Sequence, residues 1–125
     1  MSDIVADTLA RIKNAVMRRH ESVNVTNSKI SASIVEILKQ ENFVEGYEID
    51  GNDIVVSLKY AAGEPMVENF VKVSKPGQRI YVGYKDILPV MNGRGIAIIS
   101  TSNGLMTGAQ AKSKKLGGEY ICKIW

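Results

Sequence analysis

The spacing of hydrophobic residues constrains the fold of this chain more than any other feature of its sequence. Hydrophobic side chains recur every three or four positions near the start of the chain, at Val5, Leu9, Ile12 and Val16. This spacing predicts a helix over about residues 3–19, with Ser2 or Asp3 as its cap. The same spacing returns at Ile30, Ile34, Ile37 and Leu38. It predicts a second helix, with Ser28 as its cap.

Strand patterns fill most of the remaining chain. A short strand is expected at 23–26, and two strands, at 43–49 and 54–60, flank a turn at 50–53. The periodicity lapses at 61–65, a stretch of small residues and proline, and we place the domain boundary there. The later elements are strands at 66–73, 79–84, 95–101 and 119–125, one helical turn at 85–91, and a short helix over 107–116 that Thr107 caps and Gly117 stops.

These elements predict an α+β fold of two small α/β domains packed together. The length of 125 residues suits one domain or two small ones. We expect an N-terminal domain, 1–63, with the order α-β-α-β-β, and a C-terminal β-rich domain, 64–125, with a short helix. In the last strand, alternation places Tyr120, Cys122 and Ile124 on one face and Ile121 and Lys123 on the other.

Composition excludes several classes of protein. Hydrophobic residues make up 45% of the chain and charged residues 23%, which excludes a disordered or fibrous chain. The single cysteine, Cys122, and the single histidine, His20, can form neither an internal disulfide nor a multi-cysteine zinc site. The N-terminus lacks the pattern of a signal peptide, and the uncharged stretch 95–111 is too polar to span a bilayer. We therefore expect a cytoplasmic protein with no metal, cofactor or membrane segment.

Positive charge is concentrated in the second half of the chain. Residues 1–60 hold seven basic and nine acidic residues, whereas residues 61–125 hold nine basic and four acidic ones. Clustered lysine and arginine side chains displace counterions from phosphate backbones, so this asymmetry favours a polyanionic partner. Ordinary solvated surface charge is the alternative.

The most informative segment is the end of the apolar strand at 95–99. Ser100, Thr101 and Ser102 follow this strand and precede Asn103 and Gly104. Hydroxyl groups both donate and accept hydrogen bonds, which suits the 2′-hydroxyls and base edges of RNA. Glycine permits a left-handed backbone and the close approach of a partner. The alternative is a hairpin end whose hydroxyls satisfy their own backbone.

A second segment, at 117–119, extends this hypothesis. One glycine suffices to end a helix, so the pair Gly117 and Gly118 indicates that something packs against the backbone there. A carboxylate repels phosphates, so Glu119 beside RNA is useful when it faces base amino groups. The alternative for Glu119 is an ion pair with the nearby lysines, Lys112, Lys114 and Lys115.

Two tyrosines, Tyr81 and Tyr84, lie three residues apart in the strand predicted at 79–84. They therefore point to opposite faces of a regular strand, and one of them can face outward. An outward tyrosine can stack on an unpaired base. We expect Tyr81 to be the exposed one.

These segments resemble the signature of a known family, the eighth family of bacterial small-subunit ribosomal proteins. The resemblance is carried by 95–107 with Ala111 and Lys112, and it covers nearly the whole chain. The other matching residues are Asp7, Arg11, Ile12, Lys13, Asn14, Ser28, Lys29, the stretches 72–77 and 79–81, and the run Leu116, Gly117, Gly118 and Glu119.

The resemblance implies a structural constituent of the small ribosomal subunit and not an enzyme. Such a protein binds the central domain of 16S ribosomal RNA, helps to assemble the subunit platform beside neighbouring small-subunit proteins, and in some bacteria represses its own operon messenger RNA. The implied RNA-binding residues are Ser100, Thr101, Ser102, Asn103, Gly104, Thr107, Lys112, Gly117, Gly118, Glu119, Tyr81, Lys85 and Arg94, with Ser28, Lys29, Arg11 and Lys13 as supporting contacts from the N-terminal domain.

Three departures from the family pattern alter the contacts expected with RNA. Val82, Gly83 and Tyr84 stand where many members carry a basic run, and Arg94 is expected to compensate. Lys112 replaces the usual arginine, so it lacks the planar bidentate fork. Asn27 stands where a proline is common.

Two other functions are possible on the sequence alone. One is a hydrolase or transferase with Ser100 or Ser102 as nucleophile. It lacks a partner base, because the only histidine, His20, lies at the end of the first helix, in the other domain. The chain also lacks a Gly-Lys-Ser or Gly-Lys-Thr phosphate loop, and no small-molecule substrate is expected. A protein-interaction module with an acidic partner is the second alternative, but it leaves the glycine pair and the three hydroxyl residues unexplained.

Overall fold

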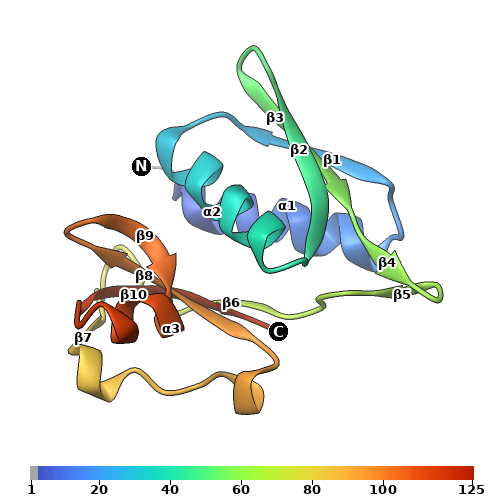
Figure 1. Cartoon of the computed structure of the whole chain (residues 1–125). Helices are drawn as coiled ribbons and strands as arrows, with labels where there is room; N and C mark the ends of the chain where they lie inside the picture. Colours follow the sequence, from blue (N-terminus) through green and yellow to red (C-terminus); the bar gives the residue numbers. More distant parts are fainter. Residues whose placement is uncertain (1–2) are drawn as a thin grey trace. The chain divides into compact units, whose positions relative to one another are not determined.

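The computed structural model describes residues 3–125 and has the α+β architecture expected from the sequence (Figure 1). Its contacts divide the chain into two compact units, the first ending at Glu68 and the second spanning Asn69–Trp125. The elements of the first unit are α1 (Ile4–Met17), β1 (Ser22–Thr26), α2 (Lys29–Gln40), β2 (Val44–Asp50), β3 (Asp53–Leu58), β4 (Tyr60–Ala61) and β5 (Glu64–Pro65). The order α-β-α-β-β is confirmed, and a small hairpin follows it.

Both long helices begin at side-chain caps. The Asp3 carboxylate accepts hydrogen bonds from the backbone N–H groups of Val5 and Ala6, each at 3.2 Å, and so caps α1. The other expected cap, Ser2, lies outside the described residues. At α2, the N–H of Ser31 donates to the Ser28 hydroxyl at 3.1 Å, and the N–H of Ser28 donates to the Ser31 hydroxyl at 3.0 Å. This reciprocal capping box satisfies two backbone donors that the helix leaves free.

The sheet of the first unit is antiparallel, in the order β1-β3-β2. Val25, Ile54 and Val56 are fully buried and lie on one face of it, the face covered by α1 and α2 (Figure 1). Gly51 takes a φ of 60° in the turn between β2 and β3, as the residue types at 50–53 predict.

The stretch 61–65 belongs to the first unit. Tyr60 pairs with Pro65, and Ala62 and Gly63 turn the chain with φ values of 53° and 80°. The loss of hydrophobic periodicity therefore marks a tight hairpin, and the division between the two units falls later, after Glu68.

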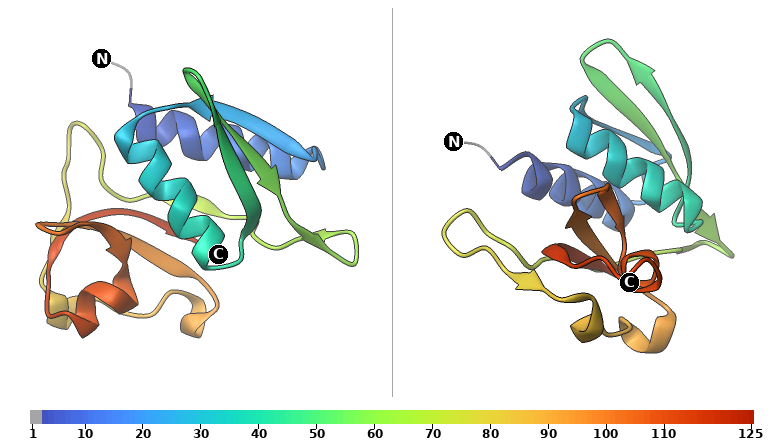
Figure 2. Two further views of the ribbon diagram at one scale, coloured as in Figure 1. Left: turned by 45° about the horizontal axis from the view of Figure 1, so that its top comes forward. Right: turned by 60° about the vertical axis from the view of Figure 1, so that its left-hand side comes forward.

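The second unit is built around one central strand. Its elements are β6 (Phe70–Lys72), β7 (Tyr81–Val82), the 3₁₀ turns η1 (Tyr84–Asp86) and η2 (Met91–Gly93), β8 (Ile96–Thr101), β9 (Gly104–Thr107), α3 (Gly108–Ser113) and β10 (Gly118–Ile124). The sheet runs in the order β6-β10-β8-β9, and β7 also pairs with β10 (Figures 1 and 2). One face is covered by a hydrophobic cluster of Ile87, Ala97, Ile99, Met106 and Ala111, to which α3 contributes.

Several predicted elements are shorter than expected. Of the strands predicted at 66–73 and 79–84, only Phe70–Lys72 and Tyr81–Val82 pair within the sheet. The predicted stop of the last helix at Gly117 is wrong. The helix α3 ends at Ser113, and Lys115 takes the left-handed conformation after it, with a φ of 58°.

The predicted alternation of the last strand is also wrong. The register of β10 against β8 shifts between Tyr120 and Cys122, which is the signature of a bulge. Ile121 and Cys122 are consequently both buried, although they are neighbours in the chain. Within residues 3–125, no helix combines the length and the apolar character that crossing a membrane requires.

Candidate nucleic-acid interface

The strand register brings four of the side chains near the predicted interface into one line. Glu119 on β10 pairs with Tyr81 on β7 and with Ser100 on β8, and Ser100 pairs in turn with Leu105 on β9. Directly paired residues point to the same face of a sheet. Tyr81, Glu119, Ser100 and Leu105 therefore form a line across four strands, which we call the cross-strand row. Its face is opposite the one that carries Ile99 and Tyr120.

The three consecutive hydroxyl residues have different roles at the hairpin between β8 and β9. The Thr101 hydroxyl donates to the carbonyl of Gly104 at 2.9 Å and accepts from the N–H of Asn103 at 3.1 Å. Gly104 takes the left-handed φ of 101° that this turn requires. By contrast, the side chains of Ser100, Ser102 and Asn103 have no hydrogen-bond partner among the described residues. The alternative interpretation, in which a hydroxyl bonds to its own hairpin backbone, therefore holds for Thr101 and not for Ser100 or Ser102.

The glycine pair before Glu119 is explained by the protein's own backbone. A Cβ on Gly118 would overlap the carbonyl oxygen of Ser100, and a Cβ on Gly117 would meet the carbonyl oxygen of Val82 at 2.5 Å. At either position a side chain would overlap the neighbouring backbone. The pair therefore allows β7, β10 and β8 to approach closely beside the cross-strand row, and the partner that packs against these glycines is internal.

Glu119 pairs with Arg79, which matches the family pattern but is not among the RNA-binding residues that the resemblance implies. The Arg79 guanidinium donates from Nη1 to Oε2 of Glu119 at 3.1 Å. No ion pair links Glu119 to Lys112, Lys114 or Lys115 among the described residues. The Glu119 side chain is 19% exposed, so the carboxylate is reachable from solvent at the sheet face.

Tyr81 is the outward tyrosine, as predicted. It is 70% exposed, whereas Tyr84 is half-buried. The ammonium of Lys85 lies 6.0 Å from the centre of the Tyr84 ring, a cation–π distance. An exposed ring at one end of the cross-strand row offers a flat surface for stacking.

The other cations that were predicted to contact RNA lie on other elements of the second unit. Lys85 is exposed on η1, Arg94 is exposed after η2, and Lys112 is exposed on α3. The Lys112 ammonium donates to the carbonyl of Ile87 at 3.3 Å, which holds it beside η1. These side chains can neutralise phosphates, but the structure does not place them within the cross-strand row.

Thr107 cannot offer its side chain at the surface. It is only 5% exposed, and its hydroxyl accepts from the N–H of Gln110 at 3.2 Å. The Gln110 side chain in turn accepts from the N–H of Thr107 at 3.0 Å. This is a capping box, so Thr107 fixes the start of α3, as the sequence predicts.

The four predicted residues of the first unit lie on α1 and at the start of α2. Arg11 and Lys13 are exposed on α1, and Arg11 is paired with Asp7 at 3.0 Å. Ser28 is the cap of α2, and Lys29 is exposed at its first turn. Arg11 and Ser28 thus have local structural partners of their own.

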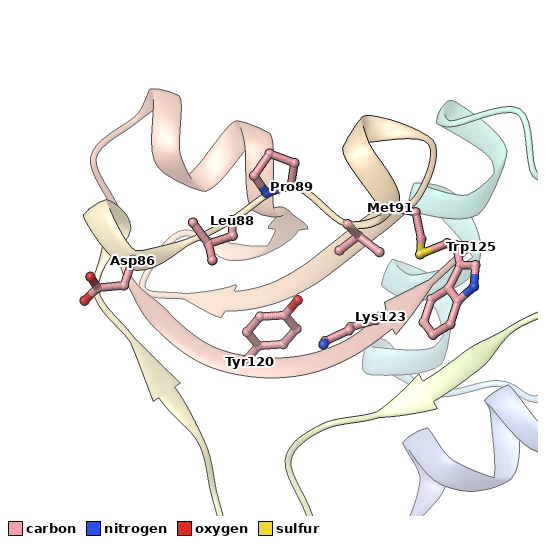
Figure 3. A pocket seen from close by; sticks show the side chains of 8 residues that line it. Asp86, Leu88, Pro89, Met91, Tyr120, Lys123 and Trp125 are labelled. Carbon is pink, nitrogen blue, oxygen red and sulfur yellow. The ribbon is translucent and has the colours of Figure 1, made fainter.

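A pocket of about 310 Å³ lies on the other face of the second sheet (Figure 3). It is lined by Asp86, Leu88, Pro89, Val90, Met91, Tyr120, Lys123 and Trp125. Tyr120 follows Glu119 directly in β10 and points to the opposite face. Its single cation and mostly apolar lining do not provide the clustered charge that phosphates need. The pocket is therefore not part of the cross-strand row.

The described part of the chain contains no group of three or more histidine, cysteine or acidic side chains that could hold a metal ion. Cys122 is fully buried, and burial raises the pKa of its thiol to about 12. A thiol with such a pKa is neither a nucleophile nor a metal ligand near neutral pH. The polar groups at the cross-strand row and the adjoining hairpin are the hydroxyls of Ser100 and Ser102, the Asn103 amide and the Glu119 carboxylate.

The sequence of this chain is similar to those of known proteins. A family model described as Ribosomal protein S8 matches residues 3–125. The small ribosomal subunit protein uS8 of Nitratidesulfovibrio vulgaris (strain DSM 19637 / Miyazaki F) is 48% identical over 125 residues, which cover 100% of this chain and 99% of that protein. The uS8 protein of Dechloromonas aromatica (strain RCB) is 45% identical over 128 residues, covering 99% of this chain and 98% of that protein. Because the family model matches residues 3–125 and both relatives are similar over nearly their whole length, the chain belongs to the ribosomal protein S8 family.

Proposed function

We propose that this protein is a structural component of the small ribosomal subunit that binds the central domain of 16S ribosomal RNA directly, mainly through its second unit. The observation that carries this proposal is the set of unpaired polar side chains at one end of the second sheet. The side chains of Ser100, Ser102 and Asn103 have no hydrogen-bond partner within the described part of the chain. Ser100 lies opposite Glu119 in the sheet, and Glu119 lies opposite the exposed Tyr81. Uncharged donors and acceptors beside a stacking surface are suited to the bases and sugars of an irregular RNA helix.

Cations at other positions support the proposal with a second kind of contact. Lys85, Arg94 and Lys112 are exposed on the second unit and can neutralise phosphates. Arg11, Lys13 and Lys29 would add backbone contacts from the first unit. Phosphate contacts position a protein on RNA, and contacts to bases and sugars specify the site.

The curated relatives are small ribosomal subunit proteins and not enzymes. We accordingly propose a role in assembly of the subunit platform beside neighbouring small-subunit proteins, on a cytoplasmic ribosome. The same surface would bind a messenger RNA of the protein's own operon if that RNA presents a similar distorted helix. Competition between the two RNAs for one protein then tests whether they share the site.

A binding titration tests the main proposal. The protein is titrated against a 16S central-domain fragment and against an unrelated RNA duplex, each at two salt concentrations. We expect selective binding that weakens as salt rises. Ser102→Ala and Glu119→Ala should each weaken binding about tenfold or more. Ser113→Ala, which removes an exposed hydroxyl on α3, is the matched control and should bind as the parent does. Equal affinity for both RNAs would contradict the proposal.

A further inference from the structure

We infer that Arg79 is a positioning residue for RNA recognition: it holds the Glu119 carboxylate in place to accept from a nucleobase amino group, and it is not a phosphate contact. The inference rests on the proposed function. It adds a residue that is absent from the RNA-binding residues implied by the family resemblance.

The contact itself leaves half of the carboxylate free. Arg79 donates one hydrogen bond, from Nη1 to Oε2 at 3.1 Å. Within residues 3–125, the second oxygen, Oε1, has no hydrogen-bond partner. A carboxylate accepts through both oxygens, so Glu119 can keep its arginine and still accept from a ligand. Exocyclic amino groups of bases are the donors that a carboxylate recognises.

The position of the pair in the sheet fits this division of roles. Arg79 lies two residues before Tyr81, just ahead of β7, and its contact with Glu119 brings its guanidinium to the cross-strand row. Glu119 pairs with Tyr81 on one side and with Ser100 on the other. Arg79 thus contacts Glu119 from the β7 side, while the unpaired Ser100 hydroxyl lies across β10 on the β8 side.

The backbone that carries Arg79 is held on its C-terminal side by a buried serine. Ser74 is 1% exposed, and its hydroxyl accepts from the N–H of Ile80 at 2.9 Å. The carbonyl of Ile80 accepts from the N–H of Tyr120 at 2.8 Å. Both polar groups of the residue after Arg79 are therefore fixed, one of them by the strand that carries Glu119.

A tight turn holds the same segment on its other side. Lys75 and Gln78 exchange two backbone hydrogen bonds, of 3.0 and 2.9 Å, around Pro76 and Gly77. The guanidinium consequently extends from a backbone that is already ordered, which reduces the entropy lost when the ion pair forms.

The ion pair with Arg79 reduces the repulsion between Glu119 and the phosphates of an RNA. An isolated carboxylate beside a phosphate backbone repels it. With Arg79 in contact, Glu119 keeps its acceptor oxygen while the pair carries no net charge. If Arg79 instead gripped a phosphate, Glu119 would be left as an uncompensated anion at the interface.

A double-mutant cycle separates the two roles. The affinity for the 16S central-domain fragment is measured over a series of salt concentrations for the parent, Arg79→Gln, Glu119→Gln and the double variant. We expect each single substitution to weaken binding about tenfold, and the double variant to bind about as well as either single variant. Arg79→Gln should leave the slope of log affinity against log salt unchanged, and Arg79→Lys should restore part of the affinity.

Two further measurements make the result decisive. Lys123→Gln removes one positive charge from β10 without touching Glu119, so it controls for net charge. Thermal unfolding of each variant should remain within a few degrees of the parent, because the pair is partly exposed. Multiplicative losses in the double variant, or a salt slope reduced by about one in Arg79→Gln, would overturn the inference while leaving the proposed function intact. Failure of the parent to prefer the fragment over unrelated duplex would overturn both.

Discussion

The α-carbon of Gly118 lies so close to the backbone carbonyl of Ser100 that no Cβ fits between them. This close approach explains why position 118 holds a glycine, which the sequence alone does not explain. The glycine is required by the contact between β10 and β8, and that contact sets the positions of Glu119 and Ser100 in the cross-strand row.

Gly118→Ala should therefore destabilise the second unit. The added methyl group must push two paired strands apart, and such overpacking costs about 1–3 kcal/mol or more. Urea unfolding measures the loss, and RNA affinity should fall with it. Gly77→Ala is the matched control, because a Cβ there has no atom within 4 Å and its φ is not left-handed. Equal stability of the two variants would refute the steric explanation.

The stability of the protein should depend on the Thr101 hydroxyl but not on the Ser102 hydroxyl. Thr101→Val removes the group that bonds to Asn103 and Gly104, so the free energy of unfolding should fall by about 1 kcal/mol. Ser102→Ala removes no internal hydrogen bond, and its stability should stay within about 0.5 kcal/mol of the parent. Chemical denaturation of both variants shows which of them has the lower free energy of unfolding. A larger loss for Ser102→Ala would show that its hydroxyl has an internal role.

Tyr81 should contribute to RNA binding through its ring. Because the side chain is 70% exposed, Tyr81→Ala should change stability little. Stacking on a base is worth about 1–3 kcal/mol, so affinity should fall about tenfold or more. Tyr81→Phe keeps the ring and should retain most of the affinity in the same titration. If Tyr81→Phe bound as weakly as Tyr81→Ala, the phenolic hydroxyl and not stacking would be responsible.

Stability should decline in alkali because of Cys122. Burial raises the pKa of its thiol from an ordinary 9.0 to about 12, and the charge of Lys72 lowers it to a lesser extent. Above pH 9 the unfolded thiol loses its proton while the folded one keeps it, so the folded state is progressively disfavoured from about pH 9 to about 12. Below pH 9 this contribution to stability is fully present.

Urea unfolding at several pH values, compared with Cys122→Ala, isolates this effect. The variant should lose less stability than the parent across the same interval. Its remaining decline reports other groups, including Tyr120, whose pKa burial also raises. Parallel curves for the two proteins would rule out the thiol as the cause.

The first unit was predicted well because its signals are local. Helical spacing, the caps Asp3 and Ser28, and the turn residues at 50–53 all act within a few positions of the chain. The cap at Thr107 was predictable for the same reason. Hydrophobic periodicity alone was misleading at 61–65, where a tight hairpin satisfies the backbone without contributing a buried stripe.

The geometry of the candidate site depends on contacts between distant segments. Nothing in the local sequence aligns Tyr81, Glu119 and Ser100, because that line follows from the register of three strands. The same register brings Arg79 to Glu119, whereas proximity along the chain favoured the lysines of α3. The bulge after Tyr120 is equally invisible in a pattern of alternation, since it adds one residue to a strand without changing its composition.

The central position of β10 has a consequence for biosynthesis. It follows every other described strand in the chain, yet it pairs with β6, β7 and β8 and carries Glu119. Translation proceeds from the N-terminus, so the earlier strands emerge before the strand that joins them. A nascent or prematurely terminated polypeptide that lacks Gly118–Ile124 therefore has neither a completed second sheet nor Glu119, so the second sheet closes only after β10 has been translated.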